Sequence, residues 1–274
     1  MPDNPYMPKP ARIAEVKQEV EGARAIKTFR VQFVEDGFTH QCGQCAMLSV
    51  LGKGESMISI SSSPLEKEYL QFSIMRVGRV TTAIHEMQEG DLIGVRGPYG
   101  NQFPIEKWKG KNLIFIGGGI GLAPIWSVLQ TARGKKKEYG DLTLFYGART
   151  SSDIVYKDEL EELKQEMAVQ LSIDVGEPGW DDFVGFVPVN LLDKKPSPKN
   201  AIAITCGPPI MIKFVIKNLE ALGFKDDQIF TTVENKMKCG IGKCGRCNIG
   251  DIYVCRDGPV FSYAQIKDFF SSEY

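Results

Sequence analysis

The first third of the chain alternates short apolar runs with turn residues. The runs are rich in β-branched and aromatic side chains, and they occupy residues 26–34, 46–51, 57–61, 69–77 and 92–95. Short strands at this spacing predict a small antiparallel β-barrel. Residues 81–87 are expected to form one short helix across it.

The pattern changes after residue 100. Apolar runs that suit buried strands occur at residues 113–116, 142–146, 169–174, 201–205 and 229–233. They alternate with helical stretches, of which the clearest are residues 123–132, 156–166 and 210–222. Alternating strands and helices predict a doubly wound parallel α/β sheet.

Length and pattern together predict the domain organisation. A chain of 274 residues exceeds the usual size of one domain, so two compact domains are favoured. We expect a tail at residues 1–10, a β-barrel domain at 11–104, an α/β domain at 105–233, and a Gly- and Cys-rich loop with a tail at 234–274.

Composition excludes several classes of function. The chain is 43% hydrophobic and 24% charged, and its net charge of -1 gives no general attraction to nucleic acid. No apolar run reaches the roughly 18 residues that a membrane span needs. The first residues show neither a signal-peptide nor a transit-peptide pattern, which favours a cytoplasmic location.

Four of the seven cysteines lie close together near the end of the sequence. They are Cys239, Cys244, Cys247 and Cys255. Their spacing begins C-x4-C-x2-C, which plant-type ferredoxins use to bind a [2Fe-2S] cluster. Glycines between them permit positive φ angles and allow backbone N–H groups to approach the sulfurs. A structural zinc site is the alternative, although it usually has two C-x2-C pairs and this loop has one.

A second C-x2-C motif, Cys42 to Cys45, leads directly into a predicted barrel strand. A redox motif of this kind is expected near a βαβ unit, which this region lacks. We therefore expect both cysteines to be buried and inert, as small apolar side chains.

A glycine-rich turn follows the first strand of the α/β domain. The turn reads GGGIGLAP, and its candidate nucleotide-binding residues are Gly117, Gly118, Gly119, Gly121 and Pro124. Glycines let the backbone approach a pyrophosphate, and the helix that follows offers N–H donors. Leu122 stands where the standard fingerprint has its third glycine. A tight turn made only for packing is the alternative.

Two other strand ends are candidates for the same crevice. Cys206, Gly207 and Pro208 follow the fourth expected strand of the sheet, and ligands bind where such strand ends meet. Arg149 follows the second expected strand, where an acidic residue often binds ribose. This favours the 2′-phosphate of NADP, although a surface arginine is the commoner explanation.

In combination these motifs resemble the ferredoxin-NADP reductase superfamily, in the branch with a C-terminal [2Fe-2S] loop. The resemblance rests on the barrel with its serine motif, GPYG, GGGIGLAP, CGPP and the four-cysteine loop. Residues 234–247 and 257–261 are most similar to gamma subunits of cytoplasmic sulfhydrogenases, which are nickel-iron hydrogenases. Electron-transfer subunits of dihydroorotate dehydrogenase are also similar.

The resemblance implies FAD bound against the barrel. It implies that Ile58 and Ser59 lie near the isoalloxazine ring, and that the pyrophosphate and ribose are bound by residues from the stretch Arg76, Gly78, Arg79, Val80, Thr81 and Thr82. Thr81 and Thr82 at a helix start also suit an anion. Ser56 occupies the position where the superfamily commonly has an arginine.

The implied activity is that of a diaphorase-type electron-transfer subunit. NAD(P)H passes hydride to FAD, FAD passes single electrons to the cluster, and the cluster exchanges them with a partner, in either direction. The expected partners are iron-sulfur and nickel-iron hydrogenase subunits in a hetero-oligomer. A stand-alone flavin reductase and a zinc-containing, non-catalytic interaction module on the same fold are the alternatives.

Overall fold

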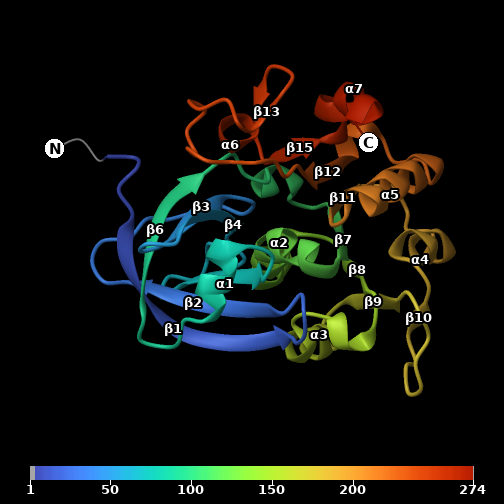
Figure 1. Cartoon of the computed structure of the whole chain (residues 1–274). Helices are drawn as coiled ribbons and strands as arrows, with labels where there is room; N and C mark the ends of the chain where they lie inside the picture. Colours follow the sequence, from blue (N-terminus) through green and yellow to red (C-terminus); the bar gives the residue numbers. More distant parts are fainter. Residues whose placement is uncertain (1–3, 274) are drawn as a thin grey trace.

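An antiparallel sheet forms the first half of the protein, for which a computed structural model describes residues 4–273 and the side chains of residues 4–268 (Figure 1). Its six strands have the order β4-β3-β6-β1-β2-β5. They are β1 Lys9–Val20, β2 Ile26–Phe33, β3 Cys45–Val50, β4 Gly54–Ser59, β5 Leu70–Met75 and β6 Leu92–Tyr99. The ends of the edge strands are joined where the Ser61 N–H donates to the Gln71 carbonyl. The expected antiparallel barrel is confirmed.

The long strand β1 is not among the expected strands. Of its 12 residues only Ala11, Ile13 and Val20 are buried, and charged side chains occupy much of the rest. Because polar residues dominate, the alternation that marks a half-buried strand is weak in this sequence. The helix α1, Arg79–His85, buries Ile84 in the core of this half.

A seven-stranded sheet forms the second half, in the order β10-β9-β8-β7-β11-β12-β15. Its strands are β7 Asn112–Gly118, β8 Leu142–Ala148, β9 Ala168–Ile173, β10 Phe183–Val184, β11 Ala201–Cys206, β12 Ile229–Thr232 and β15 Val260–Ser262. All pairs are parallel except β12 with β15. The predicted doubly wound α/β sheet is confirmed, with an antiparallel edge strand added.

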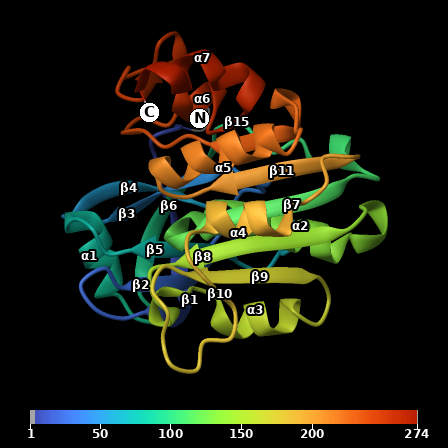
Figure 2. The same cartoon turned by 90° about the vertical axis from the view of Figure 1, so that its right-hand side faces the viewer.

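Helices cover both faces of this sheet. They are α2 Leu122–Gly134, α3 Lys157–Leu163, α4 Val187–Lys194 and α5 Pro209–Ala221. The helices α2 and α3 pack on the face that presents Leu113 and Phe115. The helices α4 and α5 lie on the opposite face, which presents Ile114 and Ile116 (Figure 2). The short α4 and β10 fall in a stretch to which the sequence assigns no element.

The two halves are packed into one another. Cys42 and Phe103 from the first half belong to the same buried cluster as α2. The ring of Trp126 stacks on that of Tyr156 with centroids 4.3 Å apart, and the Tyr156 hydroxyl lies 2.5 Å from Ser73 Oγ of the barrel. This interface fixes the position of the second sheet against the barrel.

The C-terminal part is more ordered than the expected loop and tail. It contains β13 Asn248–Ile249, β14 Ile252–Tyr253, α6 Val254–Asp257, β15 and α7 Tyr263–Glu273. Val260 and Phe261 are buried, so β15 returns the chain to the edge of the second sheet. No helix in the described part of the chain is long and apolar enough to cross a bilayer.

Candidate functional site

The GGGIG turn and the CGPP turn touch each other at the carboxyl ends of β7 and β11. A Cβ atom on Gly121 would lie 2.5 Å from Gly207 Cα, and one on Gly118 would lie 2.4 Å from Met211 Sδ. Gly119 has a φ of +53°. The strand order reverses between β7 and β11, which is where doubly wound sheets bind ligands.

Backbone N–H donors are available where these two turns meet. The helix α2 begins directly after Gly121 without a side-chain cap, so its first N–H groups are not used by a capping side chain. Pro124 lies in the first turn of α2 and is buried. Glycine backbone and an uncapped helix start together suit a pyrophosphate.

The end of β8, where the ribose of a nucleotide is expected, is mainly acidic. The Asp174 N–H donates to the carbonyls of Ala148 and Arg149, which brings its carboxylate beside this strand end. Partial burial raises the pKa of Asp174, while the Arg149 guanidinium opposes that rise. Glu177 Oε2 accepts the Ser151 hydroxyl at 2.5 Å. Sequence reasoning misses both carboxylates because they follow β9, the next strand along the chain.

On the barrel, the predicted flavin residues lie at the end of β4 and around α1. Ile58 and Ser59 are half-buried and pair with Ala46 and Cys45 of β3. Ser59 Oγ lies 3.8 Å from Cys45 Sγ. This strand end is therefore accessible to a flat ring that packs on the barrel.

The loop between β5 and α1 contributes fewer free side chains than the sequence suggests. The Thr81 hydroxyl accepts the N–H groups of Val77 and Gly78 and donates to the Gly78 carbonyl, so it is used in capping α1. Arg76 donates to the Gly22 carbonyl at 3.0 Å. Arg79 is exposed, and a Cβ on Gly54 would lie 3.7 Å from its Nη2 atom. Of the two predicted arginines, Arg79 is the one that makes no hydrogen bond within the described residues.

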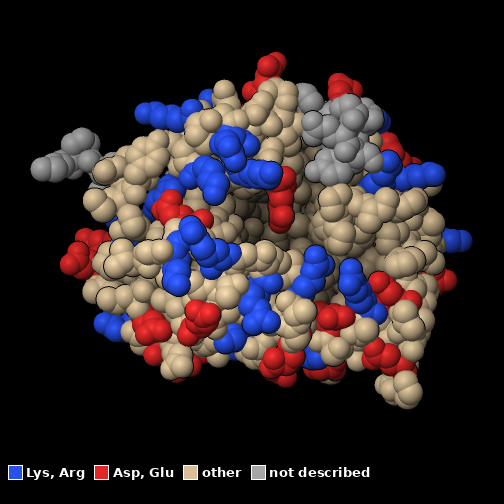
Figure 3. All heavy atoms as spheres, in the orientation of Figure 1, with Lys and Arg blue, Asp and Glu red and all other residues tan. Residues whose placement is uncertain are grey.

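A hollow separates the barrel, the second sheet and the C-terminal region, with lysine and arginine side chains around its mouth (Figure 3). Glu234 is exposed, and its charge helps to raise the pKa of both Cys45 and Cys206. The glycine turn Gly119–Gly121 also lies against β5 of the barrel, so the flavin-binding side of the barrel and the nucleotide turn are neighbours. Burial raises the pKa of Cys45 and Cys206 to about 12, and that of Cys42 to about 11. All three thiols are buried, as expected for Cys42 and Cys45.

The four cysteines of the loop converge in two pairs. The thiol of Cys239 contacts that of Cys244, and the thiol of Cys255 contacts that of Cys247. Two irons that each take two protein thiolates match this arrangement. The donor set therefore fits a [2Fe-2S] cluster.

Backbone N–H groups surround the first cysteine of the loop. Cys239 Sγ accepts N–H groups from Ile241, Lys243 and Cys244 at 3.3 to 3.5 Å. Burial raises the pKa of Cys239, but these donors outweigh it and lower the value to about 6. The glycines Gly240, Gly242 and Gly245 have φ angles of +81°, +70° and +72°, which turn the backbone inward. The loop is thus shaped to hold thiolate sulfur.

Sequence reasoning misses the side chains that hold this loop from outside. Arg96 and Asn101 of the first half donate hydrogen bonds to its backbone at both ends. The available signal is an arginine at the end of an apolar strand, close to GPYG. That signal does not reveal a partner more than 140 residues away in the sequence.

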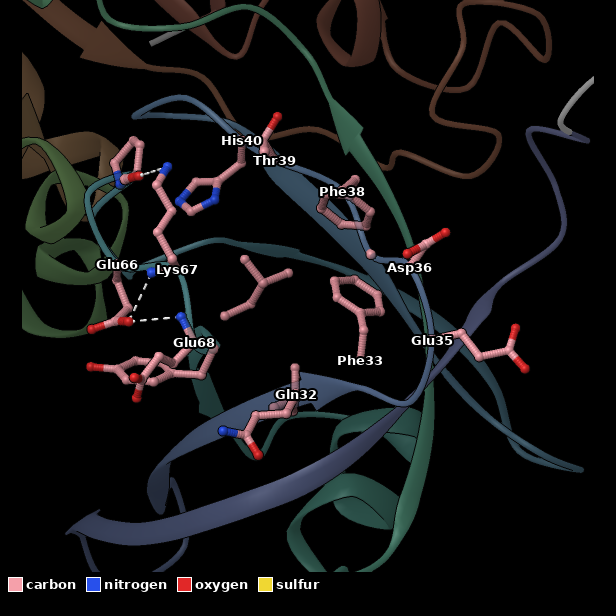
Figure 4. A pocket seen from close by; sticks show the side chains of 15 residues that line it. Gln32, Phe33, Glu35, Asp36, Phe38, Thr39, His40, Glu66, Lys67 and Glu68 are labelled. Carbon is pink, nitrogen blue, oxygen red and sulfur yellow. Dashed lines mark hydrogen bonds between the residues drawn. The ribbon is translucent and has the colours of Figure 1, made fainter.

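A separate pocket of about 600 Å³ lies on the outer side of the barrel (Figure 4). Its lining includes the contacting rings of Phe33 and Phe38 together with Glu66, Lys67 and Glu68. None of the residues predicted to bind FAD, nucleotide or cluster lines it. This pocket is outside the path that joins the three sites.

The fold and its sites define an NAD(P)-binding oxidoreductase with a flavin-type barrel and an iron-sulfur domain. Residues 115–217 match the model of the oxidoreductase NAD-binding domain, and residues 234–267 match that of the iron-sulfur cluster binding domain of dihydroorotate dehydrogenase B. These matches cover the glycine turns and all four cysteines of the loop.

Known proteins extend the match to nearly the whole chain. It is 38% identical to sulfhydrogenase 1 subunit gamma of Pyrococcus furiosus, covering 96% of this chain and 94% of that protein. It is 36% identical to the probable dihydroorotate dehydrogenase B (NAD(+)) electron transfer subunit of Methanocaldococcus jannaschii, covering 95% and 93%. A solved structure of NADH-dependent reduced ferredoxin-NADP oxidoreductase has the same fold, with a TM-score of 0.74, 23% identity and coverage of 96% and 90%.

The chain therefore belongs to the ferredoxin-NADP reductase superfamily, among the electron-transfer subunits with a C-terminal iron-sulfur domain. The resemblance stated from the sequence is confirmed, and so is the assignment as an oxidoreductase that uses FAD, NAD(P)H and an iron-sulfur cluster. The roles of individual flavin and nucleotide residues stay predictions.

Proposed function

We propose that this chain is the diaphorase-type subunit of a hydrogenase-like complex, in which it passes electrons between NAD(P)H and a partner redox subunit. FAD links the two ends chemically, because a flavin exchanges electron pairs with nicotinamide and single electrons with iron-sulfur clusters. The chain itself binds and orients these groups. No general acid or base is required of it.

The observation that carries the proposal is the meeting of three elements at one hollow. Glu234 lies near Cys45, beside the flavin strand end, and near Cys206, at the nucleotide turn. It also precedes the first cluster cysteine, Cys239, by only five positions. A nicotinamide, a flavin and a cluster bound at these elements are therefore neighbours.

Each set of residues has one task in this scheme. The glycines of the GGGIG turn, together with Gly207 and Pro208, bind the pyrophosphate of the nucleotide. Ile58 and Ser59 orient the flavin ring, and Arg79 with the α1 backbone takes the FAD pyrophosphate. The cluster is held by the four thiolates of Cys239, Cys244, Cys247 and Cys255.

A partner subunit is supported by the relatives and by the exposure of one ligand. The relatives are named as subunits of sulfhydrogenase and of dihydroorotate dehydrogenase B. Cys244 is exposed while the other three cluster cysteines are buried. We infer that electrons leave or enter on this side, toward iron-sulfur and nickel-iron hydrogenase subunits. The cytoplasmic location stays a prediction.

We further infer that NADH is preferred over NADPH, against the first indication from Arg149. The ribose end of the site carries Asp174, Glu177 and Asp153 but a single arginine, which Asp174 already faces. A 2′-phosphate would add about two negative charges there. Ribose hydroxyls can instead donate hydrogen bonds to these carboxylates.

Anaerobic purification with flavin, iron and zinc measured on one sample tests the relay. About one FAD and two irons per chain are expected, with bleaching of the visible spectrum on adding NADH. Zinc without flavin would overturn the proposal in favour of an interaction module.

Isolation of the native complex tests the partner. Hydrogenase subunits that co-purify with the chain at a fixed ratio would support it. A dihydroorotate dehydrogenase subunit would replace this partner by the other one that the relatives suggest. A monomer that turns over NADH fully by itself would favour a stand-alone reductase.

A further inference from the structure

One short segment of the barrel holds the cluster loop at both of its ends. The segment runs from Arg96 in β6 to Asn101, just after the strand. Arg96 contacts the loop at its first cysteine, and Asn101 contacts it just after the fourth.

Arg96 is a buried guanidinium whose donors are all used. Only 4% of its side chain is exposed. Nη1 donates to the Cys239 carbonyl at 2.9 Å and Nη2 to the Lys238 carbonyl at 3.1 Å. Nε and Nη2 bind the two carboxylate oxygens of Glu55 at 2.9 and 2.8 Å, and Nη1 also donates to the Tyr99 hydroxyl. Five hydrogen bonds match the five N–H donors of an arginine.

The ion pair with Glu55 makes this burial possible. A buried charge is tolerated when it is paired and hydrogen-bonded, and Glu55 supplies both on the barrel side. The hydrogen bond from Arg96 lowers the pKa of Glu55, so the carboxylate stays charged near neutral pH. Ser49 Oγ donates to the same carboxylate at 2.9 Å. The guanidinium is thus fixed on the barrel before it reaches the loop.

Asn101 holds the other end of the loop through its side-chain amide. Nδ2 donates to the carbonyls of Asp257 and Val260 at 2.9 and 2.7 Å, and Oδ1 accepts the Val260 N–H at 2.9 Å. The Asn101 backbone N–H donates to the Gly258 carbonyl. These residues follow Cys255, the fourth cluster cysteine, by two to five positions.

Close backbone packing supports the same two points. A Cβ on Gly240 would lie 2.9 Å from the ring of Tyr99. A Cβ on Gly100 would lie 2.5 Å from the Gly258 carbonyl oxygen. The loop is therefore pressed against β6 beside each set of hydrogen bonds, and neither end can shift without breaking them.

We propose that Arg96 and Asn101 are positioning residues that set the place of the cluster loop relative to the flavin-binding barrel. The inference rests on the proposed function, because its purpose is a short and constant path from flavin to cluster. Electron transfer between two centres slows steeply as they move apart. Two anchors on one short segment of the barrel keep that separation constant while a partner subunit docks on the exposed side.

Two variants, one at each anchor, test this role. Arg96→Lys keeps the positive charge but loses the planar fork, and Asn101→Ala removes the amide. Arg30→Lys is the matched control, because Arg30 is also paired with a glutamate of the barrel but touches no part of the loop. Each protein is purified anaerobically, and its FAD and iron contents are measured first.

Hydrogen exchange of the whole protein reports how firmly the loop backbone is held. Amides of residues 237–245 are expected to exchange faster in Arg96→Lys, and those of residues 256–261 in Asn101→Ala. Rapid mixing with NADH then separates two steps, flavin bleaching and cluster reduction. Cluster reduction is expected to slow about tenfold in both variants, because a small displacement of two reacting centres causes a large loss of rate. Flavin bleaching is expected to change less than about twofold.

The outcomes separate this inference from the function on which it rests. Unchanged exchange in both loop ends overturns the anchoring role, and faster exchange with unchanged cluster reduction overturns its purpose. If one variant fails to fold, the other still decides between these results. If the parent protein shows no bleaching with NADH or NADPH, the proposed function fails, while the exchange comparison still tests the anchors.

Discussion

The barrel and the second sheet support their sites by opposite means. Outside the cluster loop and within the described residues, the buried side chains that carry charge or can titrate near neutral pH are His40, His85 and Arg96, and all three belong to the barrel. The polar side chains buried in the second sheet and its helices are hydroxyls and one amide. The nucleotide turn is instead built from glycine backbone. The barrel thus positions groups with side chains, and the second sheet binds by leaving side chains out.

The two kinds of site tolerate different changes. A site made of backbone is damaged by any added atom, because the space is already used by a neighbouring turn. A site held by buried polar side chains is damaged when one partner is removed, since the other partner is left unsatisfied.

The largest effect is expected from Cys255→Ala. Removal of one of four thiolates should lower the iron content from about two per chain to background. Bleaching of FAD by NADH should persist, because the nucleotide turn and the barrel do not depend on this thiol. Iron analysis and the visible spectrum of the anaerobic protein measure both.

Cys42→Ala is the control for this variant. Cys42 and Cys255 are similarly buried, at 2% and 1% exposure, but Cys42 packs against α2 rather than in the loop. The control should keep its iron. Equal iron contents in the two variants would contradict the assignment of the loop as the cluster site.

The second effect concerns the two contacting turns of the nucleotide site. Gly121→Ala places a Cβ 2.5 Å from Gly207 Cα, so the two turns must separate. We expect kcat/KM for NADH to fall about 100-fold, the size of loss that a displacement of about 1 Å causes near a reacting centre. Steady-state kinetics with a dye acceptor measure it.

Gly110→Ala is the control for Gly121→Ala. Gly110 has a positive φ of +77°, whereas Gly121 has a φ of -63°, but a Cβ on Gly110 meets no atom within 4 Å. It should lose stability slightly and keep its kinetics. A loss of FAD or iron in Gly121→Ala, with NADH kinetics intact, would show that the turn serves another site.

Local sequence patterns predict the parts of this protein that local rules govern. The GGGIG turn and the cysteine spacing are readable because a strand end, a glycine and a ligand are close together in the sequence. The strand β1 cannot be recognised in this way, since charged residues interrupt its alternation of apolar and polar positions. The element α4 is short, and β10 has only two residues, so neither gives a clear period.

The supports of the sites are hidden for a different reason. Arg96 and Cys239 are joined by a hydrogen bond across 143 positions, and no spacing rule spans such a gap. Asp174 directly follows β9 and Arg149 directly follows β8, so their proximity depends on the strand order. The sequence predicts which residues carry the chemistry, whereas tertiary structure decides which residues hold them in place.

The third effect tests nucleotide choice at the acidic end of the second sheet. Asp174→Asn combined with Glu177→Gln removes two negative charges beside Arg149. We expect kcat/KM for NADPH to rise about tenfold relative to NADH, a modest change because exposed charges are screened by solvent and salt. A parent protein that already prefers NADPH would contradict the proposed choice, and an unchanged ratio in the variant would remove these carboxylates from it.

The smallest effect is a pH dependence confined to the barrel. Burial lowers the pKa of His85, helped by the nearby charges of Lys27 and Arg76, although a hydrogen bond to the Ile74 carbonyl opposes this. The folded protein therefore binds this proton less readily than the unfolded chain, whose histidine has a pKa of about 6.5. Stability should fall as the pH drops through and below that value, because unfolding takes up a proton there.

His85→Gln tests this dependence, because glutamine can still donate to the Ile74 carbonyl but does not titrate. Flavin release followed by fluorescence during urea unfolding reports on the barrel at each pH between 5 and 8. The parent protein should lose more stability toward pH 5 than His85→Gln, with part of the slope left because burial also lowers the pKa of His40. Equal slopes in the two proteins would mean that the acid sensitivity arises elsewhere. That result would count against the contrast between a barrel that buries titratable side chains and a sheet that does not.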